Sequence, residues 1–468
     1  MKKNCLLKVI GIVALIIMIL SWIIPASYYS GSTVIDLGTM PIGIFDILSY
    51  PFLSFQYFIQ TVIFLFTVGA FYGVLEKTGK YRNILEKIVK RLKGKEQIFI
   101  VILTLVITAL SSMLGLNLML FVFIPALIAI ILLMGYDKIS AFLITIVPMF
   151  VGIIGSTYSI YINGYINQVV GITDFGNDML SKIALLVISY VVYIMFTLAY
   201  TKKVKKAKIE EETDNIAFIG EKKQVKKASW PIITVFAIIF ALLILAPTPW
   251  TDVFNVEFFT NLHELIQNWT IGEYTIGANL LGYIKEFGKW TYLEISMVVF
   301  SAALLIGCIY KQKFSEIIDN MLYGLGKMIK PALLVTFSMI IIIMTAYHPF
   351  YITITDYVIN LSDNFNIFLT SLITIIGSVM NGEMIYLAQS SIPLIAGTFP
   401  ATEAINSLAI ITQSLYGLTM FFAPTSTMLV LGLSYLEIPY GEWLKKSWKL
   451  LLELFVIIVT IIIISVLI

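Results

Sequence analysis

Two polar breaks in otherwise apolar sequence, both near the C-terminus, contain the residue types best suited to binding a solute or an ion. The first break holds Ser378, Asn381, Gly382 and Glu383, and the second is the sequence APTST at residues 423–427. Hydroxyl, amide and carboxylate oxygens coordinate cations and fix the polar groups of small solutes. Because lipid cannot satisfy free backbone N–H and C=O groups, we expect both breaks to face protein or water.

Glu383 is the only carboxylate well inside a predicted hairpin, and it has the clearest chemistry. A charge within a membrane is costly, so such a residue usually faces a cavity and has a function. It could bind a cation, bind an ammonium group or carry a coupling proton; alternatively, it is a solvated acid at a turn. Thr425, Ser426 and Thr427 offer hydroxyls that suit sodium, although hydroxyls also cap broken helices.

The composition indicates what kind of protein positions these residues. The chain is 59% hydrophobic and 13% charged, with a mean hydropathy of +0.94, whereas soluble domains carry about 25% charged residues. Apolar runs long enough to span a bilayer recur from end to end, so the sequence predicts an all-α polytopic membrane protein. Cys5 and Cys308 lie in or beside apolar runs and are not expected to pair, and no metal-binding or haem-binding spacing occurs.

Nine helices are expected to cross the membrane. The first, at about residues 6–25, could instead belong to a cleaved signal peptide, but no small-x-small cleavage site follows its apolar core. The other eight are predicted at about residues 52–75, 139–161, 183–200, 230–245, 295–310, 331–347, 402–436 and 450–468. A short basic loop is expected before the helix at residues 331–347. Residues 1–200 and 230–468 form two halves, joined by a polar, basic linker at residues 201–229.

Two further apolar runs predict helical hairpins that enter and leave the membrane on one side, at about residues 97–134 and 364–399. The first run breaks at Ser111, Ser112, Gly115 and Asn117. The helix that follows it is itself broken at residues 155–159, as the helix at residues 402–436 is broken at residues 423–427. Each half therefore contains a hairpin, a broken helix and a closing helix. The first hairpin is entered from the inside and the second from the outside, which predicts the inverted repeat of an alternating-access transporter.

The basic residues set the orientation. Of the 31 lysines and arginines, only Lys182, Lys285 and Lys289 fall outside the segments predicted to be cytoplasmic. This bias places the N-terminus in the cytoplasm, and nine spans then place the C-terminus outside. The basic segment at residues 77–95 is an interfacial helix or an ordinary loop helix, because its apolar residues share one face. A tryptophan-containing stretch at residues 248–291 is expected to form an outer interfacial loop.

The motifs also resemble a known family. These are GVLEKTGKYRNILEKIVKRLKGKE at residues 73–96, FIPALIAIILLMGYDKISAF at 123–142, GIIGSTYS at 152–159 and APTSTMLVLGLSYLEIPYGEWLKK at 423–446. They are similar to the YfcC-like branch of the C4-dicarboxylate anaerobic carrier family, part of the ion transporter superfamily with the AbgT and divalent-anion/sodium symporters. The resemblance implies two hairpin tips that meet two unwound helices, Gly155–Ser159 and Pro424–Thr427, where sodium and substrate bind. It also implies a homodimer.

We therefore expect a secondary transporter of a small polar solute, namely an amino acid, a peptide-like compound or a carboxylate, in the plasma or inner membrane. Neither a cofactor nor nucleic acid is expected. Transport could be coupled to a sodium or proton gradient, or it could exchange one solute for another. A gated channel is an alternative. An intramembrane enzyme is a weaker one, because both histidines, His263 and His348, are predicted outside. Without lysine or arginine in the hairpins and breaks, amine-bearing solutes are slightly favoured over dicarboxylates.

The candidate binding residues come from both tips and both breaks. Tyr158, Tyr161 and Tyr416 could add an aromatic lining or simply pack. If sodium is the coupling ion, we expect it near Ser156, Thr157, Thr425 and Ser426. The full candidate set is Ser111, Ser112, Asn117, Ser156, Thr157, Ser378, Asn381, Glu383, Thr425, Ser426 and Thr427.

Overall fold

The structure, a computed structural model, describes residues 5–31, 33–172, 176, 178–204, 218–220 and 228–467. Helices make up nearly all of it, and the one sheet among these residues is a two-stranded antiparallel hairpin. Asp174, expected in an outer loop, lies outside the described residues, as does most of the linker predicted at residues 201–229.

The first half contains every element up to the linker. In chain order these are α1 (Cys5–Ile23), β1 (Ala26–Tyr29), β2 (Val34–Gly38), α2 (Ile44–Tyr57), α3 (Ile59–Lys77), α4 (Tyr81–Leu92), α5 (Glu96–Leu114), the 3-10 turn η1 (Met119–Val122), α6 (Ile124–Leu133), α7 (Lys138–Thr145), α8 (Val147–Ile154), the π-helical turn η2 (Ile160–Gly164), α9 (Tyr165–Val170) and α10 (Met179–Lys203).

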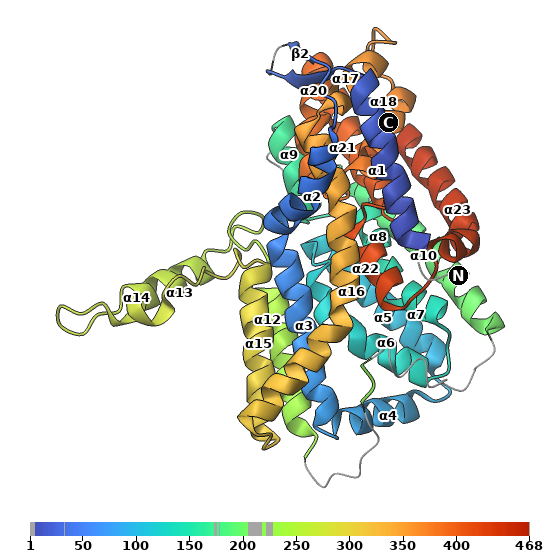
Figure 1. The fold of residues 1–468 in the computed structure, drawn as a ribbon. Coiled ribbons are helices and arrows are strands. Elements are labelled where there is room, and N and C mark those ends of the chain that lie inside the picture. The colour runs from blue at the N-terminus through green and yellow to red at the C-terminus, as the bar shows by residue number, and fades with distance from the viewer. Residues whose placement is uncertain are drawn as a thin grey trace.

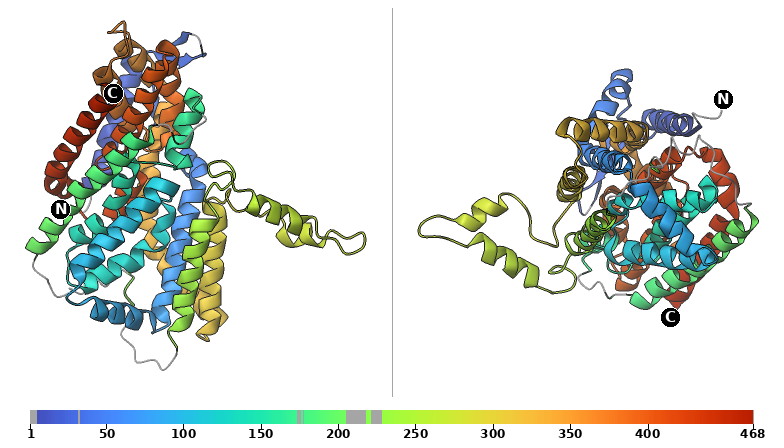
Figure 2. Two further views of the ribbon diagram at one scale, coloured as in Figure 1. Left: turned by 180° about the vertical axis from the view of Figure 1, so that it is seen from behind. Right: turned by 90° about the horizontal axis from the view of Figure 1, so that it is seen from below.

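The second half begins with one additional helix and a projecting arm. Its elements are α12 (Trp230–Leu245), α13 (Phe258–Gln267), α14 (Ile276–Leu281), α15 (Tyr292–Ile309), α16 (Phe314–Tyr347), α17 (Phe350–Ile359), α18 (Ile367–Met380), α19 (Met384–Ser390), α20 (Ile392–Thr398), α21 (Thr402–Thr419), α22 (Thr427–Tyr435) and α23 (Tyr440–Leu467). The arm, α13 and α14, extends away from the rest of the molecule (Figure 2).

Seven helices among the described residues are long and apolar enough to cross a membrane, namely α1, α3, α5, α10, α15, α16 and α23. Six of them coincide with predicted spans. The seventh, α5, is the first arm of the first hairpin. The chain is an all-α polytopic membrane protein, as its composition predicts.

The elements follow the same order in both halves. The first hairpin is α5, a turn at Gly115 and η1–α6; the second is α18, a turn at residues 381–383 and α19–α20. An interrupted helix follows each hairpin: α7–α8 continues after the first break as η2–α9, and α21 continues after the second break as α22. A long helix, α10 or α23, comes next. In Figure 1, α5 starts at the lower end beside α4, whereas α18 starts at the upper end beside α17. The hairpins thus run in opposite directions, as an inverted repeat requires; their re-entrant position in a bilayer stays a prediction.

The long helices α3 and α16 lie against each other, and glycines let their backbones touch. A Cβ atom on Gly73 would lie 2.1 Å from the carbonyl oxygen of Asn320. A Cβ atom on Gly324 would lie 2.1 Å from the carbonyl oxygen of Gly69, one turn before Gly73. Helices in membranes associate through such small-residue contacts, so a larger side chain here would separate α3 from α16.

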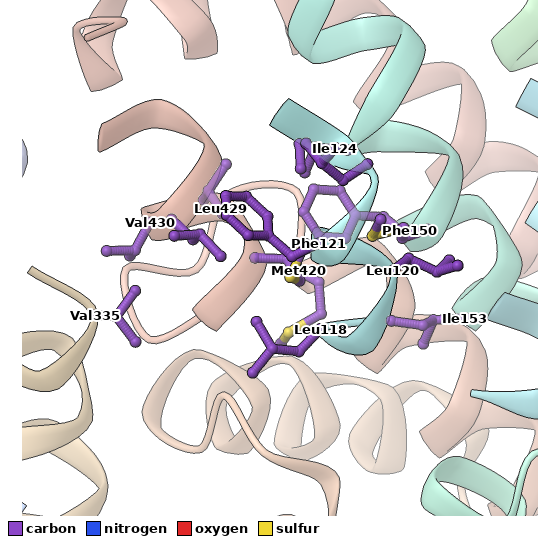
Figure 3. Close-up of a cluster of buried hydrophobic side chains, with 14 of the residues drawn as sticks. Leu118, Leu120, Phe121, Ile124, Phe150, Ile153, Val335, Met420, Leu429 and Val430 are labelled. Atoms are coloured by element: carbon purple, nitrogen blue, oxygen red, sulfur yellow. The ribbon is translucent and has the colours of Figure 1, made fainter. Parts of the chain in front are cut away.

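A buried apolar cluster holds the first hairpin against both interrupted helices (Figure 3). Phe121 of η1 and Phe150 of α8 point into it, together with Leu429 of α22 and Val335 of α16. All four are at most 1% exposed. Because helices in membranes are held together by close van der Waals packing, this cluster holds the first tip in place relative to the second break.

A short apolar piece of the linker, residues 218–220, is buried between helices of the two halves. We call its binding place the linker socket. The Phe218 ring is fully buried, with its centroid 5.2 Å from that of Tyr72 on α3 and 6.3 Å from that of Tyr435 on α22. The Lys327 ammonium of α16 lies 4.8 Å from the Phe218 ring centroid, within cation–π distance.

Hydrogen bonds also fix the linker backbone in the linker socket. The Gly220 N–H donates to Glu76 Oε1 at 2.9 Å, and Arg82 donates to the Gly220 carbonyl at 2.9 Å. Glu76 also accepts from Lys327 Nζ at 3.0 Å. The linker is thus bound by α3, α4, α16 and α22.

Several sequence-based predictions need correction. The helix expected at residues 331–347 begins earlier, because α16 is one helix from Phe314 to Tyr347 with Pro331 inside it, and the basic loop before it is residues 310–313. Packing against α3 holds the helix together on both sides of the proline, which by itself would favour a break. The predicted helix at residues 52–75 is two helices, α2 and α3, that meet at Phe58. The sequence did not indicate β1, β2 or α17.

The basic segment at residues 77–95 does form a helix, α4. Its apolar face packs on α6 and the body of the protein, with Leu85 2% exposed.

Candidate functional site

A cavity of about 200 Å³ lies between both hairpin tips, the second break and the residues that flank the first break. The first tip contributes Gly115 and Asn117, and the second contributes Gly382 and Glu383. The remaining walls are residues of α8, η2, α9, α21 and α22, and the first residue of α15. The positions are fixed locally: Gly115 closes α5 in the left-handed conformation, with φ of 67°, which glycine adopts without strain.

Glu383 supplies the carboxylate of the cavity. It is half-buried at the start of α19, and its Oε1 accepts a hydrogen bond of 2.8 Å from the hydroxyl of Thr427, the first residue of α22. The second tip is pressed against the second break, because a Cβ atom on Gly382 would lie 1.9 Å from the Thr425 carbonyl oxygen. The carboxylate therefore lies beside the beginning of α22, in agreement with the expectation that this tip meets the second break.

Four tyrosines surround this carboxylate along the cavity wall: Tyr161, Tyr165, Tyr292 and Tyr416. Tyr416 donates its hydroxyl to the Gly382 carbonyl at 2.8 Å, which ties α21 to the second tip. No lysine, arginine or histidine occurs among the described residues that line the cavity. The site is thus one acid among aromatic rings.

The sequence suggested Tyr161 and Tyr416 as lining residues but missed Tyr165 and Tyr292. Tyr292 is far away in the chain, beside a stretch that reads as outer loop, so no local signal indicated it. Tyr158 does not line the cavity; its ring lies 5.7 Å from that of Phe254.

The hydroxyls of the first tip are engaged by carbonyls of the protein. The Ser111 hydroxyl, which has one hydrogen to donate, lies 2.8 Å from Met149 O and 2.5 Å from Asn117 Oδ1. Ser112 donates to Gly155 O at 2.7 Å. Both serines are fully buried, so they hold α5 to α8 behind the cavity, and of the first tip's polar candidates only Asn117 lines it.

At the first break, Ser156 and Thr157 are buried against the first tip. The Thr157 N–H donates to the Ser112 carbonyl at 3.0 Å. The carbonyls of Ser156 and Thr157 both accept from Asn163 Nδ2, at 2.9 and 2.6 Å. Asn163 lies in η2 and is 2% exposed. It was not among the predicted residues, because an asparagine outside the break gives no local signal in the sequence.

The second tip and break divide their candidates in the same way. Ser426 and Thr427 line the cavity with Glu383. Ser378 donates to the Thr374 carbonyl at 2.6 Å, and Thr425 donates to the Val379 carbonyl at 2.8 Å. The Asn381 side chain accepts from Thr345 at 3.3 Å. These last three residues brace the tip.

The structure therefore brings all eleven candidates to one region but places only Asn117, Glu383, Ser426 and Thr427 in the cavity wall. Their roles stay predictions. Among the described residues, there is no cluster of three or more His, Cys, Asp or Glu side chains that could hold a metal ion.

Comparison with known proteins identifies the family. A family model described as C4-dicarboxylate anaerobic carrier matches residues 4–467. Among solved structures, the YdaH transporter of Alcanivorax borkumensis, whose crystal structure has an unusual topology, matches over 98% of this chain and 97% of its own. The TM-score is 0.43 and the sequence identity 12%. No curated protein sequence matches.

Proposed function

Because the chain belongs to the C4-dicarboxylate anaerobic carrier family, it is a secondary transporter of a carboxylate or another small polar solute, and we propose that the cavity at Glu383 is its transport site. The observation that carries this proposal is the convergence of both tips and the second break on one cavity, whose wall also contains residues on either side of the first break. In carriers with inverted repeats, the substrate binds at the repeat interface, beside interrupted helices.

The charge of the cavity favours a solute with an ammonium group. Glu383 is its carboxylate, the lining has no basic side chain, and tyrosine rings attract cations through their faces. A dicarboxylate would bring two negative charges to Glu383 with only hydroxyls and backbone N–H groups to balance them. An α-amino acid fits better, because one carbon separates its carboxylate from its ammonium. Its ammonium would bind Glu383, and its carboxylate would bind the adjacent N-terminus of α22.

Counterflow in proteoliposomes tests this proposal. Vesicles loaded with a mixture of amino acids should accumulate labelled amino acid, and succinate or fumarate should compete weakly. Saturable counterflow is expected of a carrier, whereas a gated channel gives none. Strong competition by dicarboxylates and none by amino acids would contradict the amine proposal while leaving the carrier function in place.

We also propose that the protein lies in the plasma or inner membrane as a homodimer, with its N-terminus in the cytoplasm. The distribution of basic residues supports the orientation, and family resemblance supports the dimer. In a variant whose two cysteines are serines, a cysteine at exposed Asn268 should react with an impermeant thiol reagent in intact cells. One at Ala207, outside the described residues, should not. The reverse labelling would overturn the orientation, and crosslinking with size measurement tests the dimer.

A further inference from the structure

The carbonyl groups exposed where a membrane helix unwinds are the groups that coordinate sodium in many coupled carriers. The family resemblance implies sodium at the two breaks of this protein. In this structure, however, the chain's own donors already bind the carbonyl oxygens of the first break and those that immediately precede the second.

The first break shows this most fully. Four successive carbonyls, from Ile154 to Thr157, each accept a hydrogen bond from a side chain. Gln413 Nε2 donates to Ile154 O at 3.2 Å, and Ser112 donates to Gly155 O at 2.7 Å. Asn163 Nδ2 donates to Ser156 O at 2.9 Å and to Thr157 O at 2.6 Å.

Asn163 is suited to this position by its chemistry. A carboxamide nitrogen carries two N–H groups and no charge, so it can donate to two carbonyls at once. The nitrogen, and not the oxygen, has to face them, because two carbonyl oxygens can only accept. A sodium ion shared by the carbonyls of Ser156 and Thr157 would have to lie where Asn163 Nδ2 lies.

At the second break, side-chain donors bind the two carbonyls that immediately precede the break. The indole N–H of Trp443 donates to Phe421 O at 2.8 Å, and the Tyr440 hydroxyl donates to Phe422 O. Both donors come from the first turn of α23, within the IPYGEW segment. Within the break, the Ala423 carbonyl accepts a hydrogen bond from the Ser426 N–H.

We propose that the Asn163 carboxamide takes the place of a coupling sodium ion at the first break, so that this carrier binds no sodium there and transports without a sodium requirement. Only the transport half of this statement rests on the proposed function. The binding half concerns the fold itself and is measurable without a known substrate.

Thermal unfolding of the purified protein tests the binding half. A ligand that binds only the folded state raises the unfolding midpoint with its concentration. At constant ionic strength, replacing potassium or choline by sodium should leave the wild-type midpoint unchanged within about one degree. A saturable rise with sodium in the wild type would overturn the proposal.

Two variants test the role assigned to Asn163. Asn163→Asp directs a carboxylate at the two carbonyls, and Asn163→Ala uncovers them; sodium should then raise the midpoint of either variant by several degrees. Asn167→Ala is the matched control, because Asn167 lies on the next turn, is buried, and has an Nδ2 with no hydrogen-bond partner. It should show no sodium effect. Folded Asn163 variants that ignore sodium would contradict the replacement.

Counterflow tests the transport half. Exchange of an accepted solute should proceed at equal rates in sodium, potassium and choline media. A sodium-dependent rate in the wild type would overturn this half. If no solute is transported at all, the proposed function fails, but the thermal measurements still decide whether Asn163 excludes sodium.

Discussion

The two hairpin tips have the same place in the repeat but different surroundings. At the first tip, Ser111 and Ser112 donate their hydroxyls to carbonyls of α8 and its break, and they are fully buried. At the second tip, Glu383 and Thr427 bond to each other at the cavity wall. The comparison teaches that the repeat has divided its tasks. The serines of the first tip hold α5 to α8, whereas the second tip places a carboxylate in the wall of the proposed transport site.

Glu383→Gln should have the largest effect on binding. The amide keeps the size of the side chain but removes its charge, and loss of a charge-assisted contact of about 1.5–3 kcal/mol weakens affinity roughly ten- to a hundred-fold. Solute affinity in proteoliposomes measures this, and Glu383→Asp should be milder. Glu403→Gln, an exposed acid on the first turn of α21, is the control. Unchanged affinity would make Glu383 a solvated turn acid.

Ser112→Ala should affect stability and leave affinity alone. It removes the donor to the buried Gly155 carbonyl, and a buried acceptor left unsatisfied costs about 1–3 kcal/mol. The unfolding midpoint in detergent should fall, while solute affinity in the variant that remains folded should stay the same. A large affinity loss at normal stability would place the first tip in the binding site after all.

Thr427→Val should do the opposite. The valine methyl replaces the hydroxyl that donates to Glu383, so affinity should fall about two- to ten-fold, with little change in the unfolding midpoint. Affinity and midpoint measured on this variant and on Ser112→Ala together form the sharpest test of the division. If both variants lost solute affinity and stability to the same extent, the division of tasks between the two tips would be contradicted.

Tyr292→Ala should have the smallest effect. It removes one ring from the cavity wall, and a cation–π contact of about 0.5–1 kcal/mol corresponds to a two- to five-fold loss of affinity for an ammonium solute. Tyr292→Phe keeps the ring face and should bind nearly as well as the wild type. If the phenylalanine variant is as weak as the alanine one, the hydroxyl contributes and not the ring.

The sequence predicted the breaks because polar and helix-breaking residues inside apolar runs are a local signal. Glu383 and Thr427 lie 44 positions apart and still bond, since each stands at a break that the fold brings together. Asn163, Tyr165 and Tyr292 gave no such signal, because their roles depend on contacts between elements distant in the chain. Pro331 led to a wrong helix boundary. A proline disfavours the interior of a helix, but tertiary packing keeps α16 helical on both sides of it.

The linker socket has one more consequence. Residues 218–220 behave as an intramolecular ligand, whose local concentration depends on the length of chain around it and not on the amount of protein. For a segment tethered within its own chain that concentration is in the millimolar range, so a free peptide of the same sequence would have to reach that range to compete. Lengthening the tether would weaken occupancy slowly, by about 0.6 kcal/mol for each doubling. Since α22 runs from Thr427 at the cavity to Tyr435 at the linker socket, the linker and the proposed transport site lie at opposite ends of one nine-residue helix.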